Sequence, residues 1–456
     1  MADILITNAR IFDASGAQPY TGEVLVQGNR ITQVKRGGSG GSSNYGSQQV
    51  IDAAGAFLMP GMTEAHTHFS WNDQPTLSAI QMMPPEEHIL WCMQVARRYL
   101  DMGWTSCVGA AAAKARLDVV TRNAIQSGSY PGPRYIAGSQ EICHLGGLGD
   151  QSLPHLPFQE LSFAHVVSGP EEMRAAVRMF VKYGVDQIKL NLSGEYIAGL
   201  PAELTPFSEE EVAMAVSEAK RLGKRVAAHA RSSESVKQCV RHGIEVIYHA
   251  SFADEEALDM LQANKDKHCF APGLAWLVNT CYHAKDFGIS TEVATQMGYM
   301  HELEAAVETL KKMYRRGITI LPGGDYGFAW MPHGTNAKDL EYFVKYIGMS
   351  TMDALLSATR EGGKVMMRPH DLGQIKPGFL ADILLIDGDP LADISVLQNA
   401  DRILAVMKDG QFHKAPQVAE TRNSGRGNGR TGDRSSERSS ERNGERKSDR
   451  AHERAY

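Results

Sequence analysis

Two histidines one residue apart carry the first chemical signal in this chain. His66 and His68 stand in "EAHTHFS", a few residues after the apolar stretch "AFLM". Side chains two positions apart on a β-strand point to the same side, so both imidazoles face one way. A pair of imidazoles on one face can hold a divalent metal ion, although two surface histidines would show the same spacing. The rest of the chain decides between these interpretations.

Further residues able to bind a metal lie at the ends of other strand-like runs. They are Lys189 in "IKLNLSG", His229 in "AAHARS", His249 in "IYHAS" and Asp325 in "PGGDYG". Imidazoles and a carboxylate suit zinc or another borderline divalent ion better than calcium or magnesium. An ammonium group binds no metal, so Lys189 can take part only if CO2 converts its amine to a carbamate. Each residue alone could be an ordinary polar residue, but their joint placement at strand ends predicts a metal site.

The elements that must position these residues alternate between strand-like and helix-like patterns. The strand-like runs are 57–68, 104–110, 134–144, 186–192, 225–230, 245–250, 268–274 and 318–325, and helical segments separate most of them. One helix is marked by Ser208 and Glu211, which form an S-x-x-E capping box. Repeated βα units predict a parallel sheet, and eight of them predict a closed (β/α)8 barrel. In such barrels catalysis occurs at the carboxyl ends of the strands.

The two ends of the chain differ from this central part. We expect the barrel over residues 59–365, and strand patterns over 1–58 and 366–416 predict a small β-sandwich built from both chain ends. From residue 418 the chain holds ten Lys and Arg against seven Asp and Glu and almost no apolar residues. Such a segment cannot bury enough surface to offset its ordering entropy. Residues 417–456 are therefore expected to form a disordered charged tail, with a basic interaction arm as the alternative.

Composition narrows the class of protein. The formal net charge of −6 is mild for 456 residues and favours neither nucleic-acid binding nor a membrane-surface role. Six cysteines occur without a CxxC pair, which disfavours a thiolate zinc site and suits reduced thiols. The N-terminus lacks a signal-peptide pattern, and no apolar run approaches the roughly 20 residues of a membrane span. We expect a soluble cytoplasmic protein.

Taken together, these motifs resemble those of the metal-dependent amidohydrolase superfamily, in its imidazolonepropionase-like and prolidase-like branch. The resemblance covers residues 3–413 and includes "AFLMPGMTEAHTH", "IKLNLSG", the two later histidines, "GGD" and "IKPGFLADILLIDGDPL". It implies a homo-oligomeric hydrolase with two divalent ions, of which Zn2+ is the expected metal. The implied ligands are His66, His68 and Asp325 for one ion and His229 and His249 for the other, bridged by carboxylated Lys189 and a hydroxide.

The mechanism implied by the resemblance is attack of the bridging hydroxide on a substrate carbonyl. Asp325 would accept the proton of the water and pass it to the leaving group. His144 in "EICHLGG" matches a histidine that prolidase-like relatives place over the substrate, where it would stabilise the oxyanion. The alternative for His144 is a loop histidine without a catalytic role.

Two departures from the prolidase-like pattern put dipeptide hydrolysis in doubt. The usual "HAYG" is "HARS" here, so Arg231 replaces a substrate-contacting tyrosine, and the usual "IEHG" is "IYHA", so Tyr248 replaces an acid. Arg231 could bind a substrate carboxylate or carbonyl, or could pair with a nearby acid. Tyr248 is a candidate substrate contact.

Aromatic residues lie where substrate loops are expected. Trp71, Trp276 and Trp330 are candidate substrate contacts, although each could equally pack in the core. They favour a small-molecule substrate with an apolar or aromatic group. By similarity to the phenylurea hydrolases of the superfamily, our first hypothesis is cleavage of an N-aryl urea or a related carbamate or anilide.

Several alternatives remain open. They are an Xaa-Pro dipeptidase or N-acyl amino acid amidohydrolase, a cyclic-amide hydrolase or deaminase, and a non-catalytic metal-binding scaffold. Lys189 disfavours a deaminase, because the deaminases of this superfamily lack the bridging lysine. The presence of every ligand together with Asp325 disfavours a non-catalytic scaffold.

Overall fold

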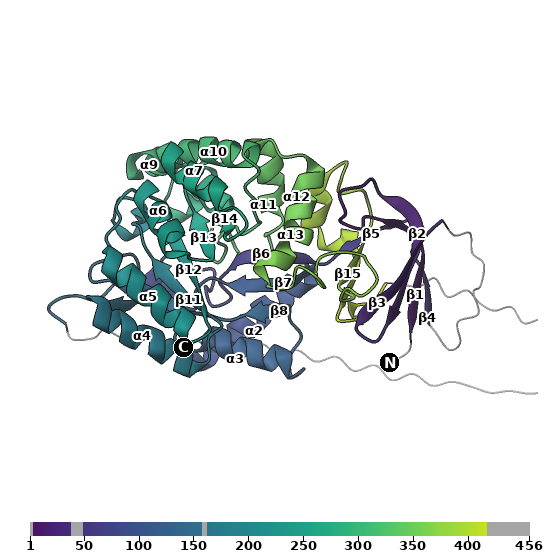
Figure 1. Cartoon of the computed structure of the whole chain (residues 1–456), viewed down its shortest axis with the longest axis horizontal. Coiled ribbons are helices and arrows are strands. Elements are labelled where there is room, and N and C mark those ends of the chain that lie inside the picture. The colour runs from purple at the N-terminus through teal and green to yellow at the C-terminus, as the bar shows by residue number, and fades with distance from the viewer. Residues whose placement is uncertain (1–2, 38–48, 157–161, 417–456) are drawn as a thin grey trace, which may run out of the picture. The chain divides into compact units, whose positions relative to one another are not determined.

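The computed structural model describes residues 3–37, 49–156 and 162–416 (Figure 1). The expected tail from residue 417 lies outside the described residues. The strands are β1 (Ile4–Ile11), β2 (Tyr20–Gln27), β3 (Arg30–Arg36), β4 (Gln49–Asp52), β5 (Phe57–Pro60), β6 (Met62–Thr67), β7 (Trp104–Gly109), β8 (Arg134–Ile136), β9 (Gly138–His144), β10 (His165–Val167), β11 (Gln187–Asn191), β12 (Arg225–Ala230), β13 (Val246–His249), β14 (Cys269–Ala271), β15 (Ile383–Ile386), β16 (Ile403–Lys408) and β17 (Gln411–Lys414).

Helices follow most of the central strands. The α-helices are α1 (Leu77–Gln81), α2 (Pro85–Asp101), α3 (Leu117–Gln126), α4 (Pro170–Tyr183), α5 (Glu209–Arg221), α6 (Ser233–His242), α7 (Glu255–Ala263), α8 (Leu274–Tyr282), α9 (Thr291–Met297), α10 (Tyr299–Arg315), α11 (Lys338–Tyr342), α12 (Thr351–Ala358) and α13 (Arg360–Val365). Short helical turns are η2 (Tyr196–Ala198), η3 (Lys285–Phe287), η4 (Phe343–Ile347), η5 (Ile394–Gln398) and η6 (Ala400–Arg402).

The central strands form two parallel sheets. One has the order β10-β9-β11-β12-β13-β14 and the other the order β6-β7-β8. Single parallel bridges join Ala112 to Gln140 and Phe270 to Ile320. The predicted α/β class with parallel strands is therefore confirmed. A closed eight-stranded barrel is not shown. The expected eighth strand, 318–325, forms no regular strand and has a single β-bridge, at Ile320, so closure stays a prediction.

Both chain ends build a separate eight-stranded sheet, seen around β1 and β15 in Figure 1. Strand β15 runs antiparallel to β5, with Ile383 opposite Pro60, and β16 and β17 extend that edge. The expected participation of both ends is thus observed. The strands form one connected sheet, so the expected two-layered sandwich is not shown. The boundaries at residues 58, 365 and 416 stay predictions.

Local sequence signals explain why helix α5 begins where it does. The Ser208 hydroxyl accepts a hydrogen bond from the Glu211 backbone N–H at 3.3 Å, and the Glu211 carboxylate accepts one from the Ser208 N–H at 3.0 Å. This reciprocal capping satisfies two backbone donors at the start of the helix. The predicted capping box is confirmed.

The register of the strands brings the candidate ligands to one edge. Strand β11 pairs with β12 so that Asn191 lies opposite His229, and β12 pairs with β13 so that Ala230 lies opposite His249. Because the three strands are parallel, their carboxyl ends meet at the same edge. The backbone N–H of Ala65 on β6 donates to the Pro322 carbonyl at 2.8 Å, which places the segment before Asp325 beside β6.

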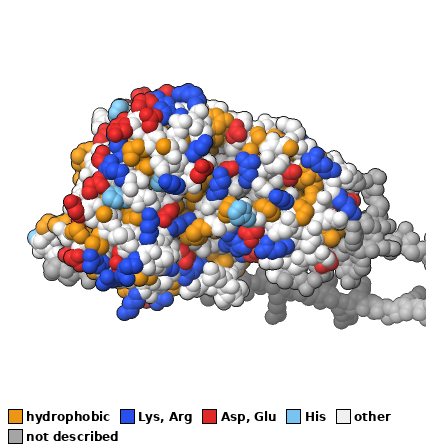
Figure 2. Space-filling view, in the orientation of Figure 1, with side chains coloured by type: hydrophobic (Ala, Val, Ile, Leu, Met, Phe, Trp, Pro, Cys, Tyr) orange, Lys and Arg blue, Asp and Glu red, His pale blue; other side chains and the backbone are white. Residues whose placement is uncertain are grey.

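The surface carries both charges close together. On the face in Figure 2, basic and acidic side chains are interspersed with hydrophobic ones. Across α7 and α10, for example, Arg316 pairs with Asp259 and with Glu255, each at 2.5 Å. Within residues 3–37, 49–156 and 162–416, none of the helices has the length and apolar character that crossing a membrane requires.

A buried ion pair ties the parallel strands to the terminal sheet, and its removal should be costly. Arg134 on β8 pairs with Asp382 at 2.7 Å and Asp409 at 2.6 Å, and Asp382 is only 3% exposed. Arg134→Met would leave that carboxylate buried without its cation. We expect a loss of about 3 kcal/mol in the free energy of unfolding, measured by urea denaturation.

The matched control is Arg402→Met. Arg402 pairs with Asp387 at the same 2.7 Å, but both side chains are more than half exposed. Exposed pairs contribute about 1 kcal/mol or less, so this variant should unfold nearly as the wild type does. Equal losses in the two variants would contradict the role given to Arg134.

Candidate metal centre and substrate pocket

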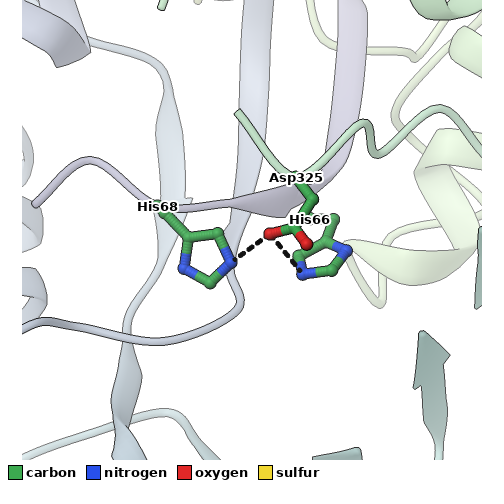
Figure 3. A group of neighbouring side chains, drawn as sticks. All are labelled: His66, His68 and Asp325. Carbon is green, nitrogen blue, oxygen red and sulfur yellow. Dashed lines mark ion pairs between the residues drawn. The ribbon is translucent and has the colours of Figure 1, made fainter. Parts of the chain in front are cut away.

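Three of the predicted ligands converge on one point (Figure 3). His66 Nε2 lies 3.4 Å and His68 Nε2 lies 3.0 Å from the same oxygen, Asp325 Oδ1. One ligand atom from each residue falls within 4.8 Å of the others, and all three residues are buried. Two imidazoles and a carboxylate are a donor set that suits zinc and similar divalent ions. The group could therefore hold a metal ion, as the sequence predicts.

The backbone around these ligands is strained and closely packed. Asp325 has φ +67° and His249 has φ +79°, a region that residues other than glycine rarely adopt. The first glycine of the "GGD" motif, Gly323, lies against His66. A Cβ at position 323 would lie 2.7 Å from the Cβ of His66. The close approach of the two chain segments thus requires glycine at that position.

Backbone carbonyls orient the imidazoles. His68 Nδ1 lies 3.0 Å from the Ala111 carbonyl and His249 Nδ1 lies 3.3 Å from the Pro272 carbonyl. Donation from Nδ1 leaves the lone pair on Nε2, which in both residues faces Asp325. His229 uses Nε2 instead, 3.0 Å from the Gly194 carbonyl, so its Nδ1 carries the lone pair.

Burial sets the charge state of the site. It lowers the pKa of His66, His229 and His249 well below the usual range, which favours the neutral imidazoles that bind metals. Burial acts to raise the pKa of Asp325, but His66 and His68 outweigh it and hold this pKa below its ordinary value. Asp325 is therefore anionic.

The second group of predicted ligands lies next to the first. The rings of His229 and His249 are 4.5 Å apart, and His249 Nε2 is 4.0 Å from Asp325 Oδ2. The Lys189 ammonium donates to Asn191 at 3.1 Å and lies 3.7 Å from a Glu141 oxygen. Burial lowers the pKa of Lys189, which favours the neutral amine.

A pocket opens over these residues and has an aromatic wall. Its lining includes the six candidate ligands together with Trp71, Trp276, Phe328, Glu141, Glu195, Leu77, Leu148 and Ile197. The Trp71 ring stacks on His68 with centroids 3.6 Å apart, and Trp276 lies 4.7 Å from Phe328. Of the three predicted tryptophans, Trp330 does not line the pocket and stacks behind Phe328.

The remaining predicted contacts lie outside the pocket lining. Tyr248 is buried and stacks on His66 with centroids 3.9 Å apart. Arg231 is fully buried and pairs with Glu302 at 2.5 Å and with Glu195, so pairing with acids is the observed alternative. His144 ends β9, and its Nε2 has no hydrogen-bond partner among the described residues. Their roles toward a substrate stay predictions.

Three acidic residues near the site were missed by sequence reasoning. Glu141 lies on β9, shortly before its last residue His144, and Glu195 lies shortly after the end of β11, so closeness to a strand end could have indicated both. Glu302 lies on α10, far along the chain from Arg231, and no local pattern predicts that pairing.

Known proteins with similar sequences or folds agree on one family. The amidohydrolase family matches residues 57–412. Ochratoxinase from Aspergillus niger is 25% identical over 389 residues, covering 79% of this chain and 76% of that protein. A crystal structure of a Xaa-Pro dipeptidase with bound methionine in the active site has a TM-score of 0.80 and 29% identity, covering 91% of this chain and all of that one.

Phenylurea hydrolase B shares the fold, with a TM-score of 0.71 at 20% identity, covering 90% of this chain and 96% of the other. The family match spans the parallel strands, every converging ligand and the C-terminal strands of the terminal sheet, β15 and β16. The resemblance predicted from the motifs is confirmed: the chain belongs to the amidohydrolase family and is a hydrolytic enzyme that acts on carbon–nitrogen bonds.

Proposed function

We propose that this enzyme hydrolyses an amide-type bond of a small molecule at a centre of two divalent ions, expected to be Zn2+. The observation that carries the proposal is the convergence of His66, His68 and Asp325 within 4.8 Å. We assign the first ion to these three residues and the second to His229 and His249. Carboxylated Lys189 is proposed as the shared ligand, because it lies in the pocket with the other candidate ligands and burial lowers the pKa of its amine, which increases the neutral fraction that reacts with CO2.

When bound, such ions acidify a water molecule and polarise a carbonyl group. The chain supplies the proton transfers. Asp325 is anionic and lines the pocket, so its carboxylate can accept a proton from the attacking water and deliver it to the leaving nitrogen. His144, with its unpartnered Nε2, is the candidate donor to the developing oxyanion. Trp71 and Trp276 exclude water from one side of the pocket.

The substrate that fits best is an N-aryl urea or a related carbamate or anilide. The aromatic wall of Trp71, Trp276 and Phe328 suits an aryl group through stacked or edge contacts. The fold shared with phenylurea hydrolase B and the sequence similarity to ochratoxinase support an amide-type substrate. An Xaa-Pro dipeptidase is the second candidate, favoured by the 29% identity to a solved enzyme of that name. A homo-oligomer is also proposed by resemblance.

Metal content provides the first test. Wild-type protein saturated with zinc and then desalted should contain two equivalents by mass spectrometry of the metal. His68→Ala removes one imidazole of the first group and should lower the content to about one equivalent. His283→Ala removes an exposed histidine away from the pocket and should leave it unchanged. Equal metal content in wild type and His68→Ala would contradict the assignment.

Turnover provides the second test. Asp325→Asn removes the proposed proton acceptor and Lys189→Ala removes the proposed shared ligand. Each should lower kcat/KM by about a hundredfold or more, while circular dichroism shows a retained fold. The substrates to screen are aryl ureas, carbamates, anilides, N-acyl amino acids and Xaa-Pro dipeptides. Undiminished activity of either variant on the best substrate would refute the mechanism.

A further inference from the structure

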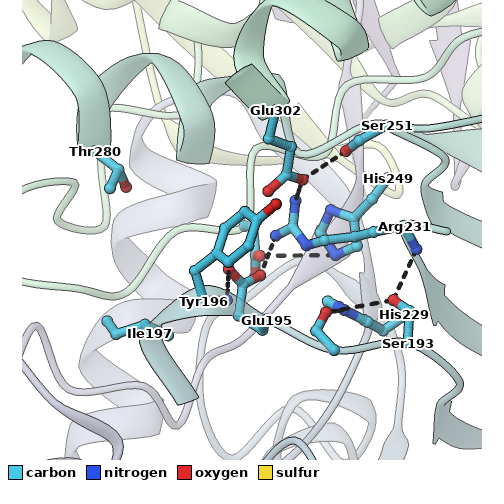
Figure 4. A network of polar contacts seen from close by, with 12 residues as sticks. Ser193, Glu195, Tyr196, Ile197, His229, Arg231, His249, Ser251, Thr280 and Glu302 are labelled. Atoms are coloured by element: carbon cyan, nitrogen blue, oxygen red, sulfur yellow. Dashed lines mark hydrogen bonds and ion pairs between the residues drawn. The ribbon is translucent and has the colours of Figure 1, made fainter. Parts of the chain in front are cut away.

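A buried ion network lies beside the pocket, and its centre is Arg231 (Figure 4). The Arg231 side chain has no exposed surface. One terminal nitrogen lies 2.5 Å from a Glu302 oxygen and the other pairs with Glu195. Two carboxylates therefore share one guanidinium. Burial raises the pKa of Glu195 to about 7, so the network carries an excess negative charge above that pH.

The network is fixed from several sides. Glu195 accepts a hydrogen bond from the Tyr299 hydroxyl at 2.7 Å and from the Tyr196 backbone N–H at 3.1 Å. Glu302 accepts one from the Ser251 hydroxyl at 2.7 Å. These residues come from segments that follow β11 and β13 and from helix α10. Rearranging Arg231 toward a substrate would leave both carboxylates buried and unpaired, which is strongly unfavourable.

The two glutamates differ in one respect. Glu195 lines the substrate pocket, whereas Glu302 is fully buried and is not part of its lining. Among the described residues that line the pocket, Lys189 is the only lysine or arginine, and three carboxylates, of Glu141, Glu195 and Asp325, accompany it. The part of the pocket wall that the structure describes thus offers no free cationic side chain for a substrate carboxylate.

We propose that Glu195, held by Arg231, determines the charge of the substrate: the enzyme accepts a leaving group without a carboxylate and rejects one that carries it. A substrate carboxylate would be desolvated beside Glu195, and like charges placed together at a binding surface disfavour the complex. Arg231 cannot offset this repulsion because its charge is already shared by two acids. The inference rests on the proposed carbon–nitrogen hydrolysis and narrows its substrates to neutral or cationic amides, ureas and carbamates.

Matched substrate pairs test this inference. N-benzoylphenethylamine and N-benzoylphenylalanine differ only by the carboxylate, and phenylureas with and without a ring carboxylate form a second pair. For the metal-loaded wild type, we expect kcat/KM to favour the neutral member by about tenfold or more. Glu195→Gln keeps the shape of the side chain and removes its charge, so it should narrow that ratio about tenfold, mainly through the KM of the carboxylate member.

Glu302→Gln is the matched control. This variant also removes a carboxylate that pairs with Arg231, but at a residue that does not line the pocket. Its ratio of kcat/KM between the neutral and the carboxylate substrate should stay within about threefold of the wild-type ratio. Equal changes of the ratio in both variants would overturn the role of Glu195. If Glu195→Gln does not fold, as judged by its thermal unfolding, the wild-type ratio of kcat/KM between the two members of each pair decides whether the enzyme rejects a carboxylate. We call this rejection the charge rule.

The outcomes separate the two proposals. A wild-type preference for the carboxylate member of either pair would refute the charge rule and leave carbon–nitrogen hydrolysis standing. Absence of turnover on both pairs and on all other substrates of the screen would refute the proposed function itself. A wild-type preference for the neutral member that is lost in Glu195→Gln and kept in Glu302→Gln would support both carbon–nitrogen hydrolysis and the charge rule.

Discussion

The placement of one buried carboxylate against two buried imidazoles is the constraint on which this site depends. Asp325 reaches His66 and His68 from a segment that forms no regular strand, with its own backbone at positive φ. Burying an anion is costly unless it has partners, so the site is stable only when those partners or a metal ion face the carboxylate. The hydrogen bond from Ala65 to Pro322 and the absence of a side chain at Gly323 make this approach possible.

The same physical problem recurs beside the pocket, where the buried charge is a cation. Arg231 is a buried cation, and Glu195 and Glu302 surround it. The metal group and the ion network are built by neighbouring elements: β11 and β12 carry Lys189 and His229, and Glu195 and Arg231 follow directly after them. The elements that present the candidate ligands therefore also define the electrostatic character of the pocket. A change at Arg231, two residues after His229, would alter the network that holds Glu195 in the pocket wall and leave the candidate ligands in place.

Aromatic contacts complete the surroundings of the ligands. Trp71 stacks on His68 and Tyr248 stacks on His66, so the two imidazoles of β6 are each covered by a flat ring. Such contacts restrict ring rotation and keep the imidazoles oriented. Tyr248, expected as a substrate contact, is observed as a support for a candidate ligand, whereas Trp71 both supports His68 and lines the pocket.

Much of the site could be predicted from the sequence, because its signals are local. The two-residue spacing of His66 and His68, and the placement of Lys189 and His229 near the ends of strand patterns, depend only on strand periodicity and on parallel βα order. The capping box at Ser208 is equally local. The structure does not show the closed barrel or the two-layered sandwich. Both depend on how strand edges pair across the whole chain, which local sequence patterns do not determine. Only the tertiary structure decided that Arg231 is held by Glu302 and that Trp330 lies behind Phe328. Those contacts join residues that lie far apart along the chain, and no sequence periodicity relates them. Burial determines which partner each side chain takes, and no short motif encodes burial.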